Sequence, residues 1–144
     1  MKQQSYKNYI RFYTPHHFIF YPVMSILFGI CAYQVFITKD KLVWLFIGLL
    51  FLAVIWLSFM MRQHYALTLQ DRIVRMELRY RYYVLTGADF GAIESKLIDS
   101  QIFALRFCSD TELPDMVSRA LKENLSGKAI KRAIRDWKGD YHRV

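Results

Sequence analysis

Three histidines are the side chains in this sequence that are best placed to do chemistry. His16 and His17 stand at the start of one long apolar run, and His64 follows a second one. If both runs cross a membrane, all three imidazoles lie on one side of it, where facing helices can hold a metal ion or a haem. The competing interpretation is a set of polar groups at the membrane surface, because no carboxylate is obviously placed to orient them. We therefore expect no cofactor, with a haem or metal carrier as an alternative.

Other sequence signatures of catalysis are missing from the chain. It has no glycine-rich phosphate loop, no Cys-x-x-C pair and no His-Glu-x-x-His motif. Cys31 falls in an apolar run and Cys108 in the polar half, so we expect no disulfide. Neither run contains an acid, lysine or arginine, which proton and ion pathways through membranes usually need. The sequence argues against an enzyme, a transporter and a channel.

The length and position of the apolar runs predict a membrane hairpin. The chain has 144 residues, 54% of them hydrophobic, and a formal net charge of +8. Residues 18–38 and 42–61 contain no charged side chain. Each run reaches the roughly 20 residues that a helix needs to cross about 30 Å of hydrocarbon. Because only residues 39–41 separate them, we predict two antiparallel spans within residues 15–61.

Positive charge is unevenly distributed around these spans. The first 17 residues carry three Lys/Arg and no acid, and five arginines lie within 20 residues after the second run, against two lysines in the loop. This bias predicts that both termini face the cytoplasm of a bacterial inner membrane. We assign residues 1–14 to a basic cytoplasmic segment and residues 62–144 to a cytoplasmic helical domain.

Small side chains predict where the two spans pack. Ser25 and Gly29 lie four residues apart on the first span. Counting depth along an antiparallel hairpin places them near Ala53 and Gly48 of the second. Small residues let helix backbones approach closely in a membrane. We expect these four positions to form the helix contact.

Beyond the second run, the sequence has the periodicity of an amphipathic helix. Five apolar side chains recur at spacings of 4, 3, 4 and 3, which places them on one helix face. They are Leu69, Ile73, Met76, Tyr80 and Tyr83. Arg75 and Arg81 each follow an acid by four residues, which favours ion pairs within the helix. Since no helix breaker intervenes, we predict one helix from residue 42 to about residue 86, with Gly87 as its stop.

Capping residues predict three further short helices. Ser100 and Ser126 are expected to begin two of them, and Ser109 with Glu112 to form a capping box for the third. Pro114 suits a first helical turn. The last helix is expected to carry a basic stripe, consisting of Lys131, Arg135, Lys138 and His142. The predicted fold is an all-α membrane protein with a two-helix transmembrane hairpin, an extended second helix and a small bundle.

Two basic faces are the candidate partner-binding surfaces. One consists of Arg72, Arg75 and Arg79 on the long helix. The other consists of Lys131, Arg135 and Lys138 near the C-terminus. Basic residues near a bilayer are attracted to anionic lipid headgroups. The same side chains suit docking on a protein or contact with the phosphates of ribosomal RNA.

Four stretches of the sequence match the pattern of one protein family. They are HYALTLQDRIVRMELR at residues 64–79, QIFALRFCSDTELP at 101–114, IKRAIRDW at 130–137 and DYHRV at 140–144. With them the chain resembles, over nearly its whole length, a family of small bacterial membrane proteins catalogued only as a domain of unknown function. The resemblance implies two spans followed by a helical cytoplasmic tail. It implies no activity, ligand or catalytic residue.

The layout of a short anchor and a patterned tail predicts a non-catalytic role. We expect an accessory or scaffold subunit that packs on a multispan protein of an inner-membrane complex and bridges it to a cytoplasmic component. The protein translocon and its ribosome are favoured, because the basic faces lie where ribosomal RNA would be. An accessory subunit of a respiratory complex and a self-assembling membrane scaffold are the alternatives.

Overall fold

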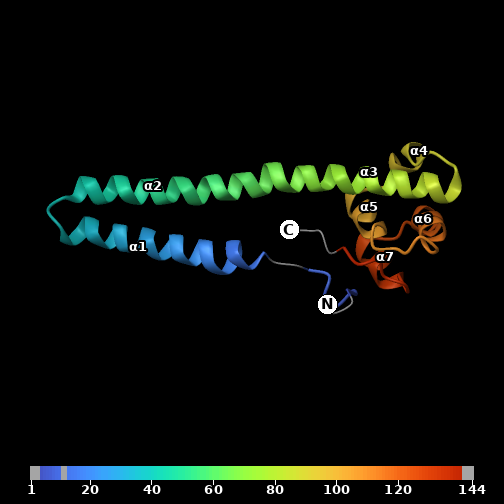
Figure 1. The fold of residues 1–144 in the computed structure, drawn as a ribbon, viewed down its shortest axis with the longest axis horizontal. Coiled ribbons are helices and arrows are strands. Elements are labelled where there is room, and N and C mark those ends of the chain that lie inside the picture. Colours follow the sequence, from blue (N-terminus) through green and yellow to red (C-terminus); the bar gives the residue numbers. More distant parts are fainter. Residues whose placement is uncertain (1–3, 11–12, 141–144) are drawn as a thin grey trace. The chain divides into compact units, whose positions relative to one another are not determined.

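The computed structural model describes residues 4–10 and 13–140, which form helices and no strand. A π-helical segment, Pro15–Phe20, leads into α1, Tyr21–Ile37; α2, Lys41–Met60, continues through a second π-helical segment, Met61–Ala66, into α3, Leu67–Thr86 (Figure 1). Four shorter helices follow, namely α4, Gly91–Glu94, α5, Asp99–Leu105, α6, Leu113–Lys122, and α7, Gly127–Ala133. The chain forms two units, residues 13–68 and residues 4–10 with 69–140. The predicted all-helical fold is confirmed at this level.

Two helices are long and apolar enough to cross a membrane, namely Pro15–Ile37 and Lys41–Thr86. The second confirms the predicted uninterrupted helix that starts near residue 42. It ends at Gly87, whose φ of +70° is the left-handed conformation of a helix-terminating glycine. The Gly87 amide donates a hydrogen bond to the Tyr83 carbonyl over 2.8 Å, as such a stop requires.

Of the four residues predicted to form the contact between α1 and α2, Gly48 is buried and the other three are exposed. A methyl group on Gly48 would lie 3.4 Å from the Cys31 Cβ. A methyl group on Gly29 would meet nothing within 4 Å, and the side chains of Ser25 and Ala53 are exposed. Counting depth places a residue along a helix but not around it. Cys31 is two residues, or about 200°, around α1 from Gly29.

The core of the second unit comes from α3 to α7. Its largest fully buried side chains include Leu78 of α3, Leu105 of α5, Leu113 of α6 and Ile130 of α7. The first turn of α6 contains Pro114, as predicted. On α6 the buried side chains recur at helical spacing, at Leu113, Met116, Val117 and Ala120.

The N-terminal segment is part of this second unit. The ring of Tyr9 lies 5.9 Å from that of Phe107 and 6.2 Å from that of Trp137, measured between centroids. The amide of Asp140 donates a hydrogen bond of 2.7 Å to the buried side chain of Gln4. Residues from both sides of the two apolar helices are therefore packed together in one folded unit.

The predicted caps of α5 and α7 had different outcomes. The Ser126 side chain accepts a hydrogen bond of 3.2 Å from the Ala129 amide, which confirms it as the cap of α7. Ser100 was the wrong choice for α5, because the helix begins at Asp99 and Ser100 lies within its first turn. The Ile98 amide instead donates to the side chain of Gln101 over 2.9 Å. A side chain inside the helix thus satisfies an amide that precedes it.

The predicted capping box of Ser109 and Glu112 does not form. Glu112 is itself the residue before α6, and its carboxylate accepts hydrogen bonds of about 3.2 Å from the amides of Arg135 and Asp136. The Ser109 hydroxyl lies 2.9 Å from that of Thr111. The Glu112 carboxylate thus binds the backbone of a distant segment and does not form the predicted local cap.

The last predicted helix is shorter than expected. α7 ends at Ala133, and Ile134 has extended backbone with ψ 124°. The Lys138 amide then donates to the Phe107 carbonyl over 2.9 Å, in an isolated antiparallel bridge. The amides of Arg135 and Lys138 thus donate to groups outside the helix. A single helical stripe therefore cannot form from Lys131, Arg135 and Lys138. His142 lies outside the described residues.

Candidate interaction surface

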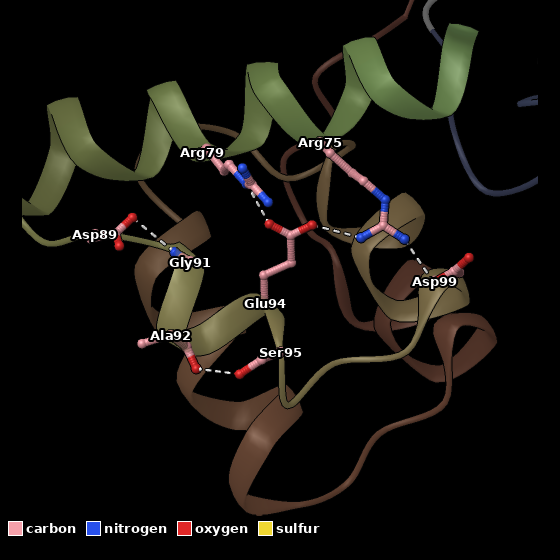
Figure 2. A network of polar contacts seen from close by, with 8 residues as sticks. All are labelled: Arg75, Arg79, Asp89, Gly91, Ala92, Glu94, Ser95 and Asp99. Atoms are coloured by element: carbon pink, nitrogen blue, oxygen red, sulfur yellow. Dashed lines mark hydrogen bonds and ion pairs between the residues drawn. The ribbon is translucent and has the colours of Figure 1, made fainter. Parts of the chain in front are cut away.

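Arg75 and Arg79 of α3 bind carboxylates of the same folded unit (Figure 2). Arg75 donates to one oxygen of Glu94 over 2.6 Å, and Arg79 donates to the other. A second nitrogen of Arg75 lies 2.7 Å from Asp99. These partners replace the predicted ion pair with Asp71. Both arginines thereby hold α3 against the short α4 and the start of α5.

Glu94 is a buried carboxylate, since its side chain is only 8% exposed. Burial alone would raise its pKa, but the hydrogen bonds from Arg79 and Arg75 outweigh burial and hold the pKa below its ordinary value of 4.5. The carboxylate is more acidic in the folded chain than in the unfolded one. It therefore stabilises the fold above the unfolded pKa, and this contribution is lost as the pH falls through the folded pKa.

We therefore expect the free energy of unfolding of the second unit to decrease when the pH drops below about 4.5. Trp137 is a suitable reporter, because its ring packs on Phe107 at 4.9 Å and the other two tryptophans can be replaced by phenylalanine. Urea midpoints from Trp137 emission, measured in detergent from pH 7 to pH 3, would show the loss. Glu94→Gln should lower the midpoint at pH 7 and reduce its dependence on pH. An unchanged dependence would contradict the assignment.

Arg81 lies inside the domain. Its guanidinium donates to the Asp110 carboxylate over 2.9 Å and to the carbonyls of Arg106 and Cys108 over 3.1 and 2.7 Å. The hydrogen bond from Arg81 is the main reason that the pKa of Asp110 lies below its ordinary value. Sequence reasoning paired Arg81 with Glu77 and missed this role, because Asp110 lies 29 residues away. Arg81 instead fixes the loop between α5 and α6.

The C-terminal basic residues have separate environments. The Lys131 ammonium lies 4.4 Å above the ring of Tyr9, a cation–π contact that holds the N-terminal segment. Lys138 is 3.5 Å from Asp110. The side chain of Arg135 is exposed and makes no ion pair among the described residues. The structure thus does not unite the three into one continuous basic face.

An exposed apolar surface of the second unit is the face of α3 that turns away from its core. Val74, Leu78 and Arg81 are the buried residues of this helix. The five side chains whose spacing predicted the helix are instead 58–71% exposed. They are Leu69, Ile73, Met76, Tyr80 and Tyr83, called here the α3 stripe. Contiguous exposed apolar side chains of this kind mark interaction sites.

Two charged residues flank the α3 stripe. Arg72 and Glu77 are both exposed, and neither makes an ion pair among the described residues. Arg72 therefore differs from the other two arginines of its predicted face. Within residues 4–10 and 13–140, the stripe stays exposed and its flanking charges form no ion pair.

The rings of His16 and His17 lie 5.4 Å apart, measured between centroids, but the three histidines have different surroundings. His16 Nε2 lies 2.8 Å from the Ser58 hydroxyl, which links the start of the first apolar helix to the end of α2. His17 lies 3.1 Å from the Tyr13 carbonyl and 2.6 Å from Arg62, contacts that fit a proton on Nδ1. His64 is exposed in the second π-helical segment. Within residues 4–10 and 13–140, no three His, Cys, Asp or Glu side chains are grouped to hold a metal ion.

Comparison with known proteins identifies the family of this chain, and the function of that family is unknown. A family model described as a family of unknown function (DUF6526) matches residues 1–144. No curated protein and no solved structure matches the chain. Because the model covers the whole sequence, this chain belongs to that family of unknown function.

Proposed function

We propose that this protein is a non-catalytic accessory or scaffold subunit of a larger assembly in the bacterial inner membrane. The α3 stripe carries the proposal, because its five apolar side chains stay 58–71% exposed in the part of the chain that the structure describes. Apolar and aromatic side chains such as Met76 and Tyr80 are enriched where proteins meet. The two apolar helices anchor this surface in the membrane.

The packing of the N-terminal segment supports a two-span topology. Tyr9 precedes the first apolar helix, yet it contacts Phe107 and Trp137, which follow the second. Segments that touch lie on one side of a bilayer, so an even number of spans separates them. The excess of Lys and Arg in these segments favours the cytoplasmic side.

The occupied arginines favour a protein as the main partner. Arg75 and Arg79 already bind Glu94, so binding them to RNA or lipid phosphates would compete with the fold. Arg72 and Arg135 remain available for such anions. The candidate assemblies are a translocon with its ribosome and a respiratory complex. In either assembly the α3 stripe would dock on protein, and Arg72 and Arg135 would lie near phosphate groups. A role as a haem or metal carrier receives less support, because His16 and His17 are bonded to Ser58 and Arg62.

Native purification tests the proposal. The full chain would be tagged after residue 144, extracted in mild detergent, and its co-purifying proteins quantified by mass spectrometry. The matched variants are Ile73→Asn on the stripe and Ile98→Asn outside it, because these isoleucines are 61% and 63% exposed. We expect a stoichiometric partner that Ile73→Asn loses and Ile98→Asn keeps. A chain that is recovered alone and does not self-associate would contradict the proposal.

A further inference from the structure

We infer that the α3 stripe is covered by the α3 stripe of a second copy of this chain, in a short parallel coiled coil. This inference rests on the proposed function, because it names the occupant of the same surface. Three features of the described residues support it: the spacing of the stripe, the signs of the flanking charges and the orientation that a shared membrane imposes.

The spacing of the stripe is that of a two-helix seam. Alternating steps of 4 and 3 residues are the heptad repeat, in which the positions named a and d face the partner helix. Ile73 and Tyr80 are then a positions. Leu69, Met76 and Tyr83 are d positions. A groove on an unrelated protein does not require this regular alternation to continue over the whole exposed length of a helix.

The flanking charges are complementary to those of a second, parallel copy. In this register Arg72 occupies position g and Glu77 occupies position e. In a parallel pair, position g of one helix lies beside position e of the following heptad in the other. Arg72 of each copy thus faces Glu77 of its partner, and the two-fold axis forms this ion pair twice. In an antiparallel pair, Arg72 would meet basic residues instead.

The membrane imposes the same orientation. Copies inserted with one topology direct their Lys41–Thr86 helices the same way across the bilayer. The charges and the anchor therefore select the same parallel arrangement independently. A coiled coil as short as Leu69–Tyr83 is only marginally stable between free helices. Confinement of both copies to one bilayer raises the effective concentration of each helix near the other.

Oxidative cross-linking of the full chain in its native membrane tests whether the stripes meet. Cys31→Ala removes one of the two natural thiols. The other, Cys108, is fully buried, and burial raises its pKa to about 12, so it does not compete. In this background we expect Ile73→Cys to give a disulfide-linked dimer several-fold more abundantly than Ile98→Cys, which has the same exposure.

Reversal of the flanking charges tests the register. Arg72→Glu and Glu77→Arg should each reduce the cross-linked fraction of Ile73→Cys about tenfold, which corresponds to about 1.4 kcal/mol, because two attractive pairs between the helices become repulsive. The double variant Arg72→Glu/Glu77→Arg should restore it. Neither residue forms an ion pair with another described residue of its folded unit, so folding is not expected to change. Failure of the double variant to restore the dimer would overturn the parallel register.

Comparison with the native purification separates the two proposals. In one outcome, Ile73→Cys cross-links no more than Ile98→Cys, while Ile73→Asn still loses a stoichiometric foreign protein. This result would overturn the second copy and leave the scaffold function standing. An equal cross-link at both positions, with no partner lost, would overturn both. A specific cross-link that the charge exchange restores would support the second copy, and foreign proteins that co-purify with the dimer would support the scaffold function.

Discussion

Replacement of Gly127 by alanine is expected to unfold the second unit, with a loss of about 3 kcal/mol or more in its free energy of unfolding. A Cβ at this position would lie 2.2 Å from the carbonyl oxygen of Ser100 and 2.7 Å from its carbonyl carbon. Both atoms are backbone within α5, so no side-chain rotation can relieve the overlap. α5 and α7 would have to move apart, and the buried contacts of Ile102 and Ile130 would loosen.

Urea unfolding of the full chain in detergent, monitored by Trp137 emission, would measure this loss. Gly29→Ala is the matched control, because the same methyl group there meets nothing within 4 Å. The control should leave the Trp137 transition unchanged. A midpoint for Gly127→Ala within error of the wild type would show that α5 and α7 are not this close.

Replacement of Arg81 by methionine is expected to cost about 3 kcal/mol of unfolding free energy. Methionine keeps most of the buried volume but donates no hydrogen bond. The carbonyls of Arg106 and Cys108 would lose their charged donor, and the Asp110 carboxylate would lose its nearer cation. Arg81→Lys should recover only part of this, since one ammonium cannot reach three acceptors in the directions of a guanidinium fork.

Alkylation of Cys108 would measure this effect near the lost hydrogen bonds. In the Cys31→Ala background Cys108 is the sole thiol, and it reacts only when the structure around it opens. Arg81→Met should raise its labelling rate by about a hundredfold, which corresponds to about 3 kcal/mol of opening free energy. An exposed arginine of the same helix that forms no ion pair among the described residues provides the control, and Arg72→Met should label at the wild-type rate. Equal rates in both variants would rule out the proposed role of Arg81.

Features that depend on neighbouring residues were predicted from the sequence. The apolar content of residues 18–38 and 42–61 is enough to predict two long helices. The stop at Gly87 and the cap at Ser126 also follow from local chemistry, because a left-handed turn and a side-chain acceptor need no distant partner. These predictions are confirmed because the local hydrogen bonds at Gly87 and Ser126 form without a distant partner.

Features that depend on distant residues were not predicted. Heptad spacing shows that Leu69 and Ile73 share a helix face, but it does not show whether that face packs inside or stays exposed. The inward face of α3 includes Arg81, and a buried arginine has no apolar signature. Glu94 lies 19 residues from Arg75, so nothing in the local sequence marks it as the partner.

Residues 4–10 and 137–140 belong to one folded unit, and this constrains the order of events during biosynthesis. In the proposed two-span topology, Tyr9 leaves the ribosome before Trp137 is made, so the N-terminal segment has no packing partner while the apolar helices are inserted. A chain with only one helix across the bilayer would have Tyr9 and Trp137 on opposite sides, and the surface around Phe107 would stay uncovered. Closure of the N-terminal segment thus depends on correct insertion, and a misinserted chain exposes an apolar site of the kind that chaperones and proteases bind.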